Sequence, residues 1–564
     1  MDNQRIILFL ALAIVVLFMW EAWEEKYNPQ PIAQQQPVSL SPGASSVPEN
    51  TVSAIPDVES SNNQDVPKVD MTAAKPAEVA QPAFESGKRI RVVTDVLDMD
   101  IDSIGGDLRR AFLIKYPLTQ DQPDKPYPYM DDNLPRLFIA QSGLLSSSEA
   151  PNHYAQYEVQ QTEYRMAEGQ NELRVPLKWT SEDGAITVTK TYVFKRGDYL
   201  IDVIHEVKNS TDQPWRGRLY TQLQRTNYDE PGQSRLLYTF TGAAVSNSNN
   251  PYDKIAFDDM AEWKPEQSYN VGGWVSMIQH YFATAWIPGK EDVNQFYTRV
   301  VNDTKYIVGL SGEEATVSSG ASHSFQRELY IGPKDQDRME VISDNLKLTV
   351  DYGFLSFIAQ PLFWLLQTIH EYVGNWGWAI IFVTLVIKLV FYKLSEASYR
   401  SMANMRKIAP KFKAIRERYG DDRQRMSQAM MELYKKEKVN PMSGCWPMLV
   451  QIPVFIALYW CLLESVELRH APFMLWIEDL SAKDPYYVLP LLMGASMFVQ
   501  QKLSHNPSLD PMHQKIMQFL PIVFTFFFML FPAGLVLYWV VNSVLSILQQ
   551  WYIMRKVDGA SKSS

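Results

Sequence analysis

The sequence predicts a multi-pass α-helical membrane protein with six transmembrane helices, five of them in a C-terminal core, and a large antiparallel β domain. Apolar segments lie at both ends of the 564-residue chain, and short alternating runs fill the region between them. Residues 21–375 carry 31 basic and 49 acidic side chains, whereas residues 376–564 carry 21 basic and 13 acidic ones. The acidic middle region argues against direct nucleic-acid binding, which requires a basic surface.

Residues 1–26 are predicted to form an N-terminal transmembrane anchor. Fifteen apolar residues, Ile6–Trp20, follow Arg5, and a helix of that length just reaches across a hydrocarbon core. The alternative is a cleaved signal peptide, which would end in small residues. Because this segment ends in bulky side chains, among them Met19 and Trp23, we favour the uncleaved anchor.

Residues 27–86 are predicted to form a disordered tether rich in Pro, Gln and Ser. Between Asn28 and Ala83 there are nine prolines and no aromatic residue. Such a segment buries too little apolar surface to offset its chain entropy, and its prolines keep it extended.

Residues 87–345 are predicted to form an antiparallel β-sandwich. Runs such as Arg174–Trp179 and Ala185–Lys195 alternate with a period of two and are separated by turn-forming residues. We found no nucleotide-binding, hydrolase or zinc-protease motif, and both cysteines, Cys445 and Cys461, lie outside this region. We therefore expect no enzyme activity, metal or cofactor, although an exposed cleft for a peptide or sugar is left open.

Residues 346–375 are predicted to form an amphipathic helix at the membrane interface. In the apolar segment 354–373, Ser356, Gln360, Gln367 and Glu371 fall on one side of a helix. A polar stripe of this kind is typical of a helix that lies along the interface rather than across the membrane.

Residues 376–554 are predicted to form the five-span core. The spans are approximately Trp376–Tyr392, Gly444–Leu463, Tyr486–Gln501, Lys515–Phe531 and Gly534–Tyr552. The loop 393–443 holds 13 basic residues, so the positive-inside rule places this loop and both termini in the cytoplasm and the β domain outside. If residues 354–373 also crossed the membrane, this basic cluster would be exported.

The basic loop is predicted to form a cytoplasmic helical hairpin, residues 394–440. Apolar residues recur at helical spacing on each arm, and Pro410 must bend or interrupt the first arm. The residues expected to join the arms are Met402, Met405, Phe412, Met430 and Leu433. A short cytoplasmic tail, residues 555–564, follows the core.

Polar side chains inside the predicted spans are candidate functional residues, because they are costly in lipid. Lys388 lies about twelve residues into the first core span, Thr384 precedes it by one helical turn, and Ser543 and Ser546 lie in the last span. The candidates for a water-filled groove are Lys388, Thr384, Gln451, Tyr538, Trp539 and Asn542. The alternatives are a lysine that extends to the interface and ordinary hydrogen bonds between helices.

Several motifs resemble the signature of the YidC/Oxa/Alb membrane protein insertases. They include Asn440–Pro447, Gln451–Phe455 and Phe531–Leu535, and the resemblance extends over essentially the whole chain, as in the members from Gram-negative bacteria. It implies a periplasmic β-supersandwich, a mobile cytoplasmic hairpin and a five-helix core. It also implies a hydrophilic groove open to cytoplasm and lipid, with Lys388 where the family has arginine, and a slide for the client's apolar segment formed by the third and fifth spans.

The function implied by this resemblance is that of an insertase and chaperone of the bacterial inner membrane. The implied partners are nascent integral membrane proteins, the lipid bilayer and the Sec translocon, and further the ribosome and the signal recognition particle receptor. The chain would act alone or with the Sec translocon, without a cofactor. Two alternatives are a secondary transporter or channel with a periplasmic ligand-binding domain, and a periplasmic sugar-binding or scaffold protein on a membrane anchor.

Overall fold

The computed structural model describes residues 86–228, 239–265, 267, 269–420, 422–437, 446–503 and 511–560. The predicted anchor, almost all of the tether and the motif Asn440–Cys445 therefore lie outside the described residues. The described residues belong to two compact units: a small one at 400–420 and 422–437, and a large one that holds all the others. Each unit is described by itself.

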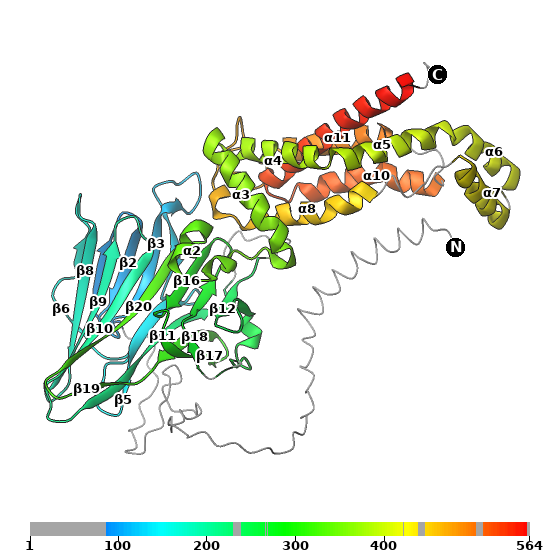
Figure 1. Cartoon of the computed structure of the whole chain (residues 1–564). Helices are drawn as coiled ribbons and strands as arrows, with labels where there is room; N and C mark the ends of the chain where they lie inside the picture. The colour runs from blue at the N-terminus through cyan, green and yellow to red at the C-terminus, as the bar shows by residue number, and fades with distance from the viewer. Residues whose placement is uncertain are drawn as a thin grey trace, which may run out of the picture. The chain divides into compact units, whose positions relative to one another are not determined.

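The β domain of the large unit consists of two sheets (Figure 1). The first contains, in spatial order, β14 (Asn270–Val271), β17 (Val293–Val301), β18 (Lys305–Gly312), β11 (Trp215–Thr226), β5 (Phe138–Ser146), β3 (Leu108–Pro117), β2 (Leu97–Asp102), β1 (Arg89–Val93) and β7 (Glu163–Arg165), with β19 (Ala315–Val317) beside β11 and β4 (Pro126–Met130) beside β3. The second contains β13 (Asp253–Ile255), β12 (Gly242–Ser246), β15 (Trp274–Ile278), β16 (Phe282–Ile287), β20 (Ser322–Pro333), β10 (Leu200–Asn209), β9 (Ile186–Lys195), β8 (Glu172–Thr180) and β6 (Glu158–Val159).

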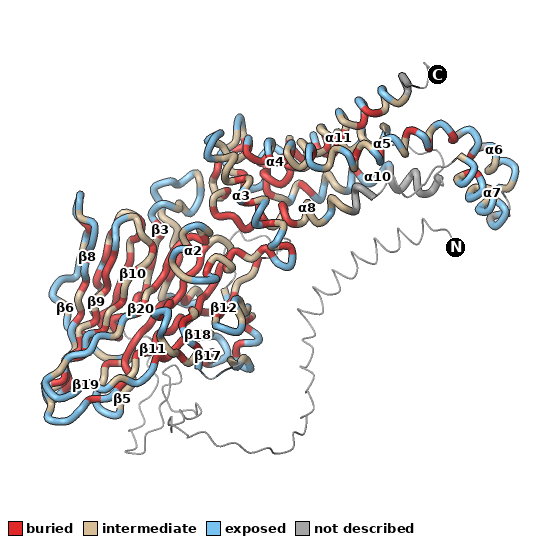
Figure 2. The backbone as a smooth tube through the Cα atoms, in the orientation of Figure 1, coloured by how far each residue is buried: buried red, intermediate tan, exposed pale blue. Residues whose placement is uncertain are grey.

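Alternation along the strands builds the core between the two sheets. On β10 the buried residues include Ile201, Val203 and Val207, with less buried residues between them, and Val203 lies opposite Tyr192 of β9. Figure 2 shows this alternation as bands of buried and less buried backbone along the central strands. The prediction of an antiparallel β domain is confirmed, with one parallel pair, β1 and β7, that the sequence pattern did not indicate.

A polar cluster around Lys190 lies inside the β domain. The Lys190 side chain is fully buried, and its Nζ donates hydrogen bonds to the carbonyl oxygens of Gly105 (3.0 Å) and Ser142 (3.2 Å). One carboxylate oxygen of Asp107 lies 3.9 Å from the ammonium, and the other accepts a hydrogen bond from Gln141. Burial lowers the pKa of Lys190 to about 8.

The segment after the β domain is more broken than the predicted 346–375 helix. It begins with α2 (Gln336–Ile342) and continues through two 3₁₀ turns, η2 (Leu346–Thr349) and η3 (Gly353–Leu355), before α3 (Ser356–Val373) starts. Gly353, inside this range, adopts a left-handed backbone conformation with φ of 59°, which an α-helix does not accommodate. A continuous helix from residue 346 is therefore wrong, whereas α3 follows the apolar segment 354–373 to within two residues.

The inner face of α3 packs against α4 (Trp376–Val390) and α8 (Trp446–Glu464) through Ala359, Phe363 and Leu366. Its outer face exposes Phe357 and Trp364. The helix thus has one buried apolar face, and its surface combines large apolar side chains with polar ones.

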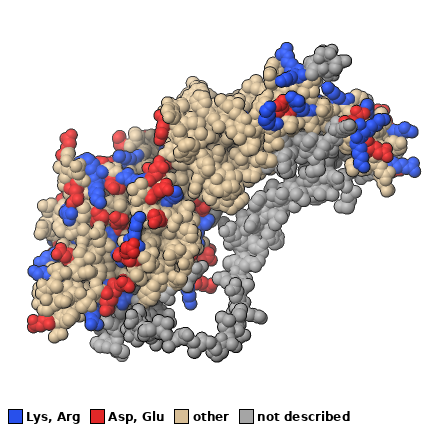
Figure 3. All heavy atoms as spheres, in the orientation of Figure 1, with Lys and Arg blue, Asp and Glu red and all other residues tan. Residues whose placement is uncertain are grey.

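The remaining helices of the core are α9 (Val488–Leu503), α10 (Pro511–Phe528) and α11 (Ala533–Ala560). Helix α11 packs against α9 and α4, and α10 packs against α9. Helix α5 (Tyr392–Lys407) follows α4 after a bend of 66°. In Figure 3 charged side chains cover the β domain, whereas the visible surface of the adjoining helical core carries few of them.

The described helices do not establish the predicted count of six spans. By length and composition one helix can cross a membrane, Ala533–Val557, or two if the bent pair of α4 and α5 forms one span. The shorter apolar helices Val450–Glu464 and Gln518–Phe528 fall below that length. A 15-residue helix such as α4 rises only about 22 Å, so the six-span count stays a prediction.

The small unit contains the helical hairpin. It consists of the end of α5, α6 (Ala409–Tyr419) and α7 (Arg423–Lys436). The break between α5 and α6 falls beside Pro410, at the start of α6, and the Asp422 side chain caps α7. Met405, Phe412 and Leu433 are buried together with Ile408, and Met430 packs against this cluster, whereas Met402 is half-buried.

Candidate functional site

The candidate site is centred on Lys388 of α4. Only 8% of this residue is exposed, and its Nζ donates a 2.7 Å hydrogen bond to Oγ of Ser546 on α11. Ser546 Oγ in turn donates to the backbone carbonyl oxygen of Asn542. Among the described residues no carboxylate forms an ion pair with Lys388. The ammonium is therefore buried between two helices and does not extend to the surface.

A polar stripe runs along α11 next to this lysine. Asn542, Ser546 and Gln549 are spaced by four and three residues, so they lie on one face of the helix. Tyr538 precedes Asn542 by one turn and is buried, and Trp539 lies beside it. Gln549 was not predicted as a site residue, although its spacing from Ser546 was a signal that could have identified it.

Thr384 and Gln451 contribute less to the arrangement than expected. Thr384 is buried one turn before Lys388, but its hydroxyl donates to the carbonyl oxygen of Ile380 in the same helix. Gln451 is half-buried on α8. Within the described residues no hydrogen bond joins Gln451 to the Lys388 and Ser546 pair.

Aromatic side chains fill the space at the N-terminal end of the stripe. The ring of Phe455 on α8 stacks on Tyr538 at 6.0 Å and meets Trp539 edge-on at 4.8 Å. Phe528 of α10 also contacts the Trp539 ring, at 5.5 Å. Three helices therefore meet around Tyr538 and Trp539, and the indole Nε1 of Trp539 is buried without a hydrogen-bond partner in the described part of the chain.

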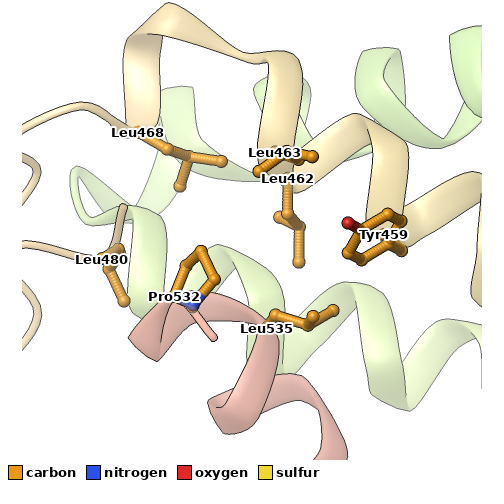
Figure 4. A pocket seen from close by; sticks show the side chains of 8 residues that line it. Tyr459, Leu462, Leu463, Leu468, Leu480, Pro532 and Leu535 are labelled. Carbon is orange, nitrogen blue, oxygen red and sulfur yellow. The ribbon is translucent and has the colours of Figure 1, made fainter. Parts of the chain in front are cut away.

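A small cavity near this end of the core is apolar and separate from the polar stripe. It lies between the end of α8 and the start of α11 (Figure 4) and has a volume of about 10 Å³. Its lining consists of Tyr459, Leu462, Leu463, Leu468, Leu480, Pro532, Gly534 and Leu535. A space of this size and lining is a packing defect, because it holds at most about one water molecule and offers that molecule few polar partners.

The C-terminal end of α8 is tied to the β domain. Glu464 forms a 2.9 Å ion pair with Lys334, and only 4% and 2% of their side chains are exposed. Lys334 also donates to the carbonyl oxygen of Thr349, and the His280 ring lies 2.8 Å from the carbonyl oxygen of Leu463. Val466, just beyond the helix, belongs to the buried core of the β domain. This end of α8 therefore forms one packed body with the sheets.

Comparison with known proteins gives full-length relatives. The family model described as "YidC periplasmic domain" matches residues 89–365, and "60Kd inner membrane protein" matches residues 368–561. The membrane protein insertase YidC of Thioalkalivibrio sulfidiphilus is 52% identical over 100% of both chains, and that of Methylococcus capsulatus is 49% identical over 99% of both. A solved structure of an active YidC insertase is 17% identical, covers 83% of this chain and 93% of its own, and has a TM-score of 0.39.

These relatives carry the names of insertases rather than of enzymes, transporters or channels. The matched regions include the β domain and the helical core with Lys388 and the α11 stripe. The chain belongs to the YidC family of membrane protein insertases.

Proposed function

We propose that this insertase passes the polar segment of an incoming membrane protein through a hydrophilic groove centred on Lys388. The observation that carries the proposal is a buried ammonium whose described partner is one neutral hydroxyl, that of Ser546. The other groove residues are Thr384, Gln451, Tyr538, Trp539 and Asn542. A carboxylate or a peptide carbonyl of the client would supply the interaction that the described protein groups leave unmet.

The energetics of insertion support this role. A lysine at the centre of a membrane helix costs about 2.5 to 3.5 kcal/mol on insertion scales. A lysine without a counter-ion at such a position therefore indicates a functional role. A groove cation lowers the cost of bringing acidic or polar groups partway across the bilayer. Burial of the client's apolar helix in lipid then contributes about 0.8 kcal/mol for each methylene group, so no nucleotide is needed.

The surrounding topology is also part of the proposal. Six spans, counted with the anchor at residues 1–26, would place both termini and the hairpin 394–440 in the cytoplasm of a bacterial inner-membrane protein, with residues 87–345 in the periplasm. The exposed Phe357 and Trp364 of α3 support a position at the membrane interface. The clients would be nascent membrane proteins; the Sec translocon, the ribosome and the signal recognition particle receptor are further proposed partners.

The test is insertion of a single-span client into proteoliposomes that contain the full-length protein alone. The variants are Lys388→Ala and Lys388→Arg, with Lys393→Ala as a matched control because the Lys393 side chain is 92% exposed. We expect wild type, Lys388→Arg and Lys393→Ala to insert a client with an acidic translocated segment. Lys388→Ala should be about tenfold to a hundredfold slower, since a hydrogen bond to a charged group contributes about 1.5 to 3 kcal/mol.

A second client, with each acidic residue of that segment replaced by its amide, separates charge from other causes. The difference between wild type and Lys388→Ala should shrink for this client. Equal rates for all variants with both clients would contradict the charged groove.

A further inference from the structure

Gln549 continues the polar stripe of α11 beyond the residue that binds Lys388. It follows Ser546 by three residues, which places its Cα about 4.5 Å farther along the helix axis on nearly the same face. Trp539 lies at the other end of the stripe, ten residues before Gln549. The Lys388 ammonium therefore lies beside the middle of a row of polar side chains.

The Gln549 amide is buried but unsatisfied. Both its Oε1 and its Nε2 are buried, and neither forms a hydrogen bond with any described residue. The side chain offers two donor hydrogens and two acceptor lone pairs, and a buried polar group without partners costs about 1 to 3 kcal/mol. Gln550, the next residue, is also buried but does have an interaction partner.

The two neighbouring glutamines thus differ: Gln550 has an interaction partner, whereas neither amide atom of Gln549 has one among the described residues. Trp539 repeats the feature at the far end of the stripe, because its indole Nε1 is also buried without a described partner. The unsatisfied atoms on α11 flank the Lys388 contact on both sides.

We propose that Gln549 is a binding site for the peptide backbone of the client's polar segment. A side-chain amide presents one acceptor and one donor group, as a peptide unit does, and it binds a passing chain without regard to sequence. Lys388, which contacts Ser546 three residues before Gln549, binds charge, whereas Gln549 binds the neutral backbone beside it. This inference rests on the proposed groove and names the part of the client that the groove holds.

The decisive variant is Gln549→Leu in the full-length protein, studied in proteoliposomes. It keeps the side-chain size and removes an unsatisfied amide, so apparent thermal stability should stay the same or rise. The insertion rate should fall about threefold to tenfold, the effect of losing one or two net hydrogen bonds to the client. Lys393→Ala is again the control, because the Lys393 side chain is 92% exposed and lies outside the third and fifth spans, and its rate should match wild type.

A photoreactive benzoylphenylalanine provides a second measurement. Placed at position 549, it should crosslink to a client arrested during insertion, whereas the same group at the exposed position 341 of α2, outside the predicted spans, should not. Unchanged insertion by Gln549→Leu, a loss of its stability, or absence of the crosslink at 549 would each overturn the inference.

The same assays separate this inference from the groove itself. If Lys388→Ala slows insertion and Gln549→Leu does not, only the proposal that Gln549 binds the client backbone is refuted. If neither variant changes the insertion rate, the groove proposal fails with it.

Discussion

Lys190 in the β domain and Lys388 in the helical core are both buried lysines, yet their surroundings differ. Lys190 donates to two carbonyl oxygens and has Asp107 at 3.9 Å. Lys388 donates to one serine hydroxyl and has no carboxylate among the described residues to pair with it. The partners of Lys190 are those of a lysine that stabilises the fold, whereas those of Lys388 fit the proposed role in binding a client. Because both lysines are buried, the comparison depends on their partners and not on burial.

The largest expected effect concerns a third buried lysine, Lys334, which has a full counter-ion. Glu464→Ala should destabilise the chain by about 3 to 5 kcal/mol, because it leaves the Lys334 ammonium buried without its carboxylate. Thermal unfolding followed by tryptophan fluorescence measures this loss. The double variant Lys334→Met/Glu464→Leu, which removes both charges, should recover most of it. A wild-type unfolding temperature for Glu464→Ala would show that the pair adds nothing.

Replacement of Lys190 tests whether this hydrogen-bonded lysine stabilises the fold. Lys190→Met should cost about 2 to 4 kcal/mol, since the carbonyl oxygens of Gly105 and Ser142 both lose a buried donor. Lys195→Met is the control: its half-exposed ammonium pairs with Asp202, and its loss should cost less than about 1 kcal/mol. Equal losses in the two variants would remove the distinction between buried and surface lysines.

The titration of Glu467 extends the comparison to an unsatisfied carboxylate outside the predicted spans. One carboxylate oxygen of Glu467 is buried without a described partner, and burial, with smaller contributions from Asp335 and Asp337, raises its pKa from 4.5 to about 7. The folded chain thus holds this proton more tightly than the unfolded chain. Its contribution to stability is fully present below pH 4.5 and is lost as the pH rises through about 7.

Between pH 5 and 8 we therefore expect wild type to lose about 2 kcal/mol relative to Glu467→Gln, which cannot ionise. Thermal unfolding of both proteins across this range measures the difference. Other titrating groups, such as His280, affect both proteins alike. Parallel pH profiles for the two would contradict the raised pKa.

The smallest effect is expected at Lys388, and it should have the opposite sign. Lys388→Met removes a buried charge whose described partner is a single hydroxyl, so stability should be unchanged or rise by about 1 kcal/mol. The same unfolding assay as for Lys190→Met measures it. A loss as large as that of Lys190→Met would show that Lys388 is a structural lysine, and the comparison between the two regions would fail.

Local patterns predicted much of the fold. Alternation of residues such as Ile201 and Val203 indicated strands, and the spacing of Met405 and Phe412 indicated a helical arm. The break of the 346–375 segment was missed because it depends on the left-handed conformation of Gly353. An isolated glycine is tolerated inside helices, so its presence alone did not indicate a break.

The site was predicted only in part, for a different reason. Their shared position in the last predicted span grouped Tyr538, Asn542 and the nearby polar residues, and Lys388 stood out as a charge in an apolar segment. Whether Gln549 has partners depends on neighbouring helices, which no local pattern reveals. The pairing of Lys334 with Glu464 likewise joins residues 130 positions apart, so nothing in either local sequence indicates it.

The location of Val466 in the core of the β domain limits how β domains can be exchanged between family members. Residues 464–466 lie at the end of α8, within the helical core in the chain, but Glu464 and Val466 pack against the sandwich. A chimera that exchanges β domains between family members at residue 345 would separate these residues from the sheets that they fit. Domain grafts should therefore transfer residues 464–466 together with the β domain. Among family members, substitutions at 464–466 should accompany substitutions at the β-domain residues that they contact.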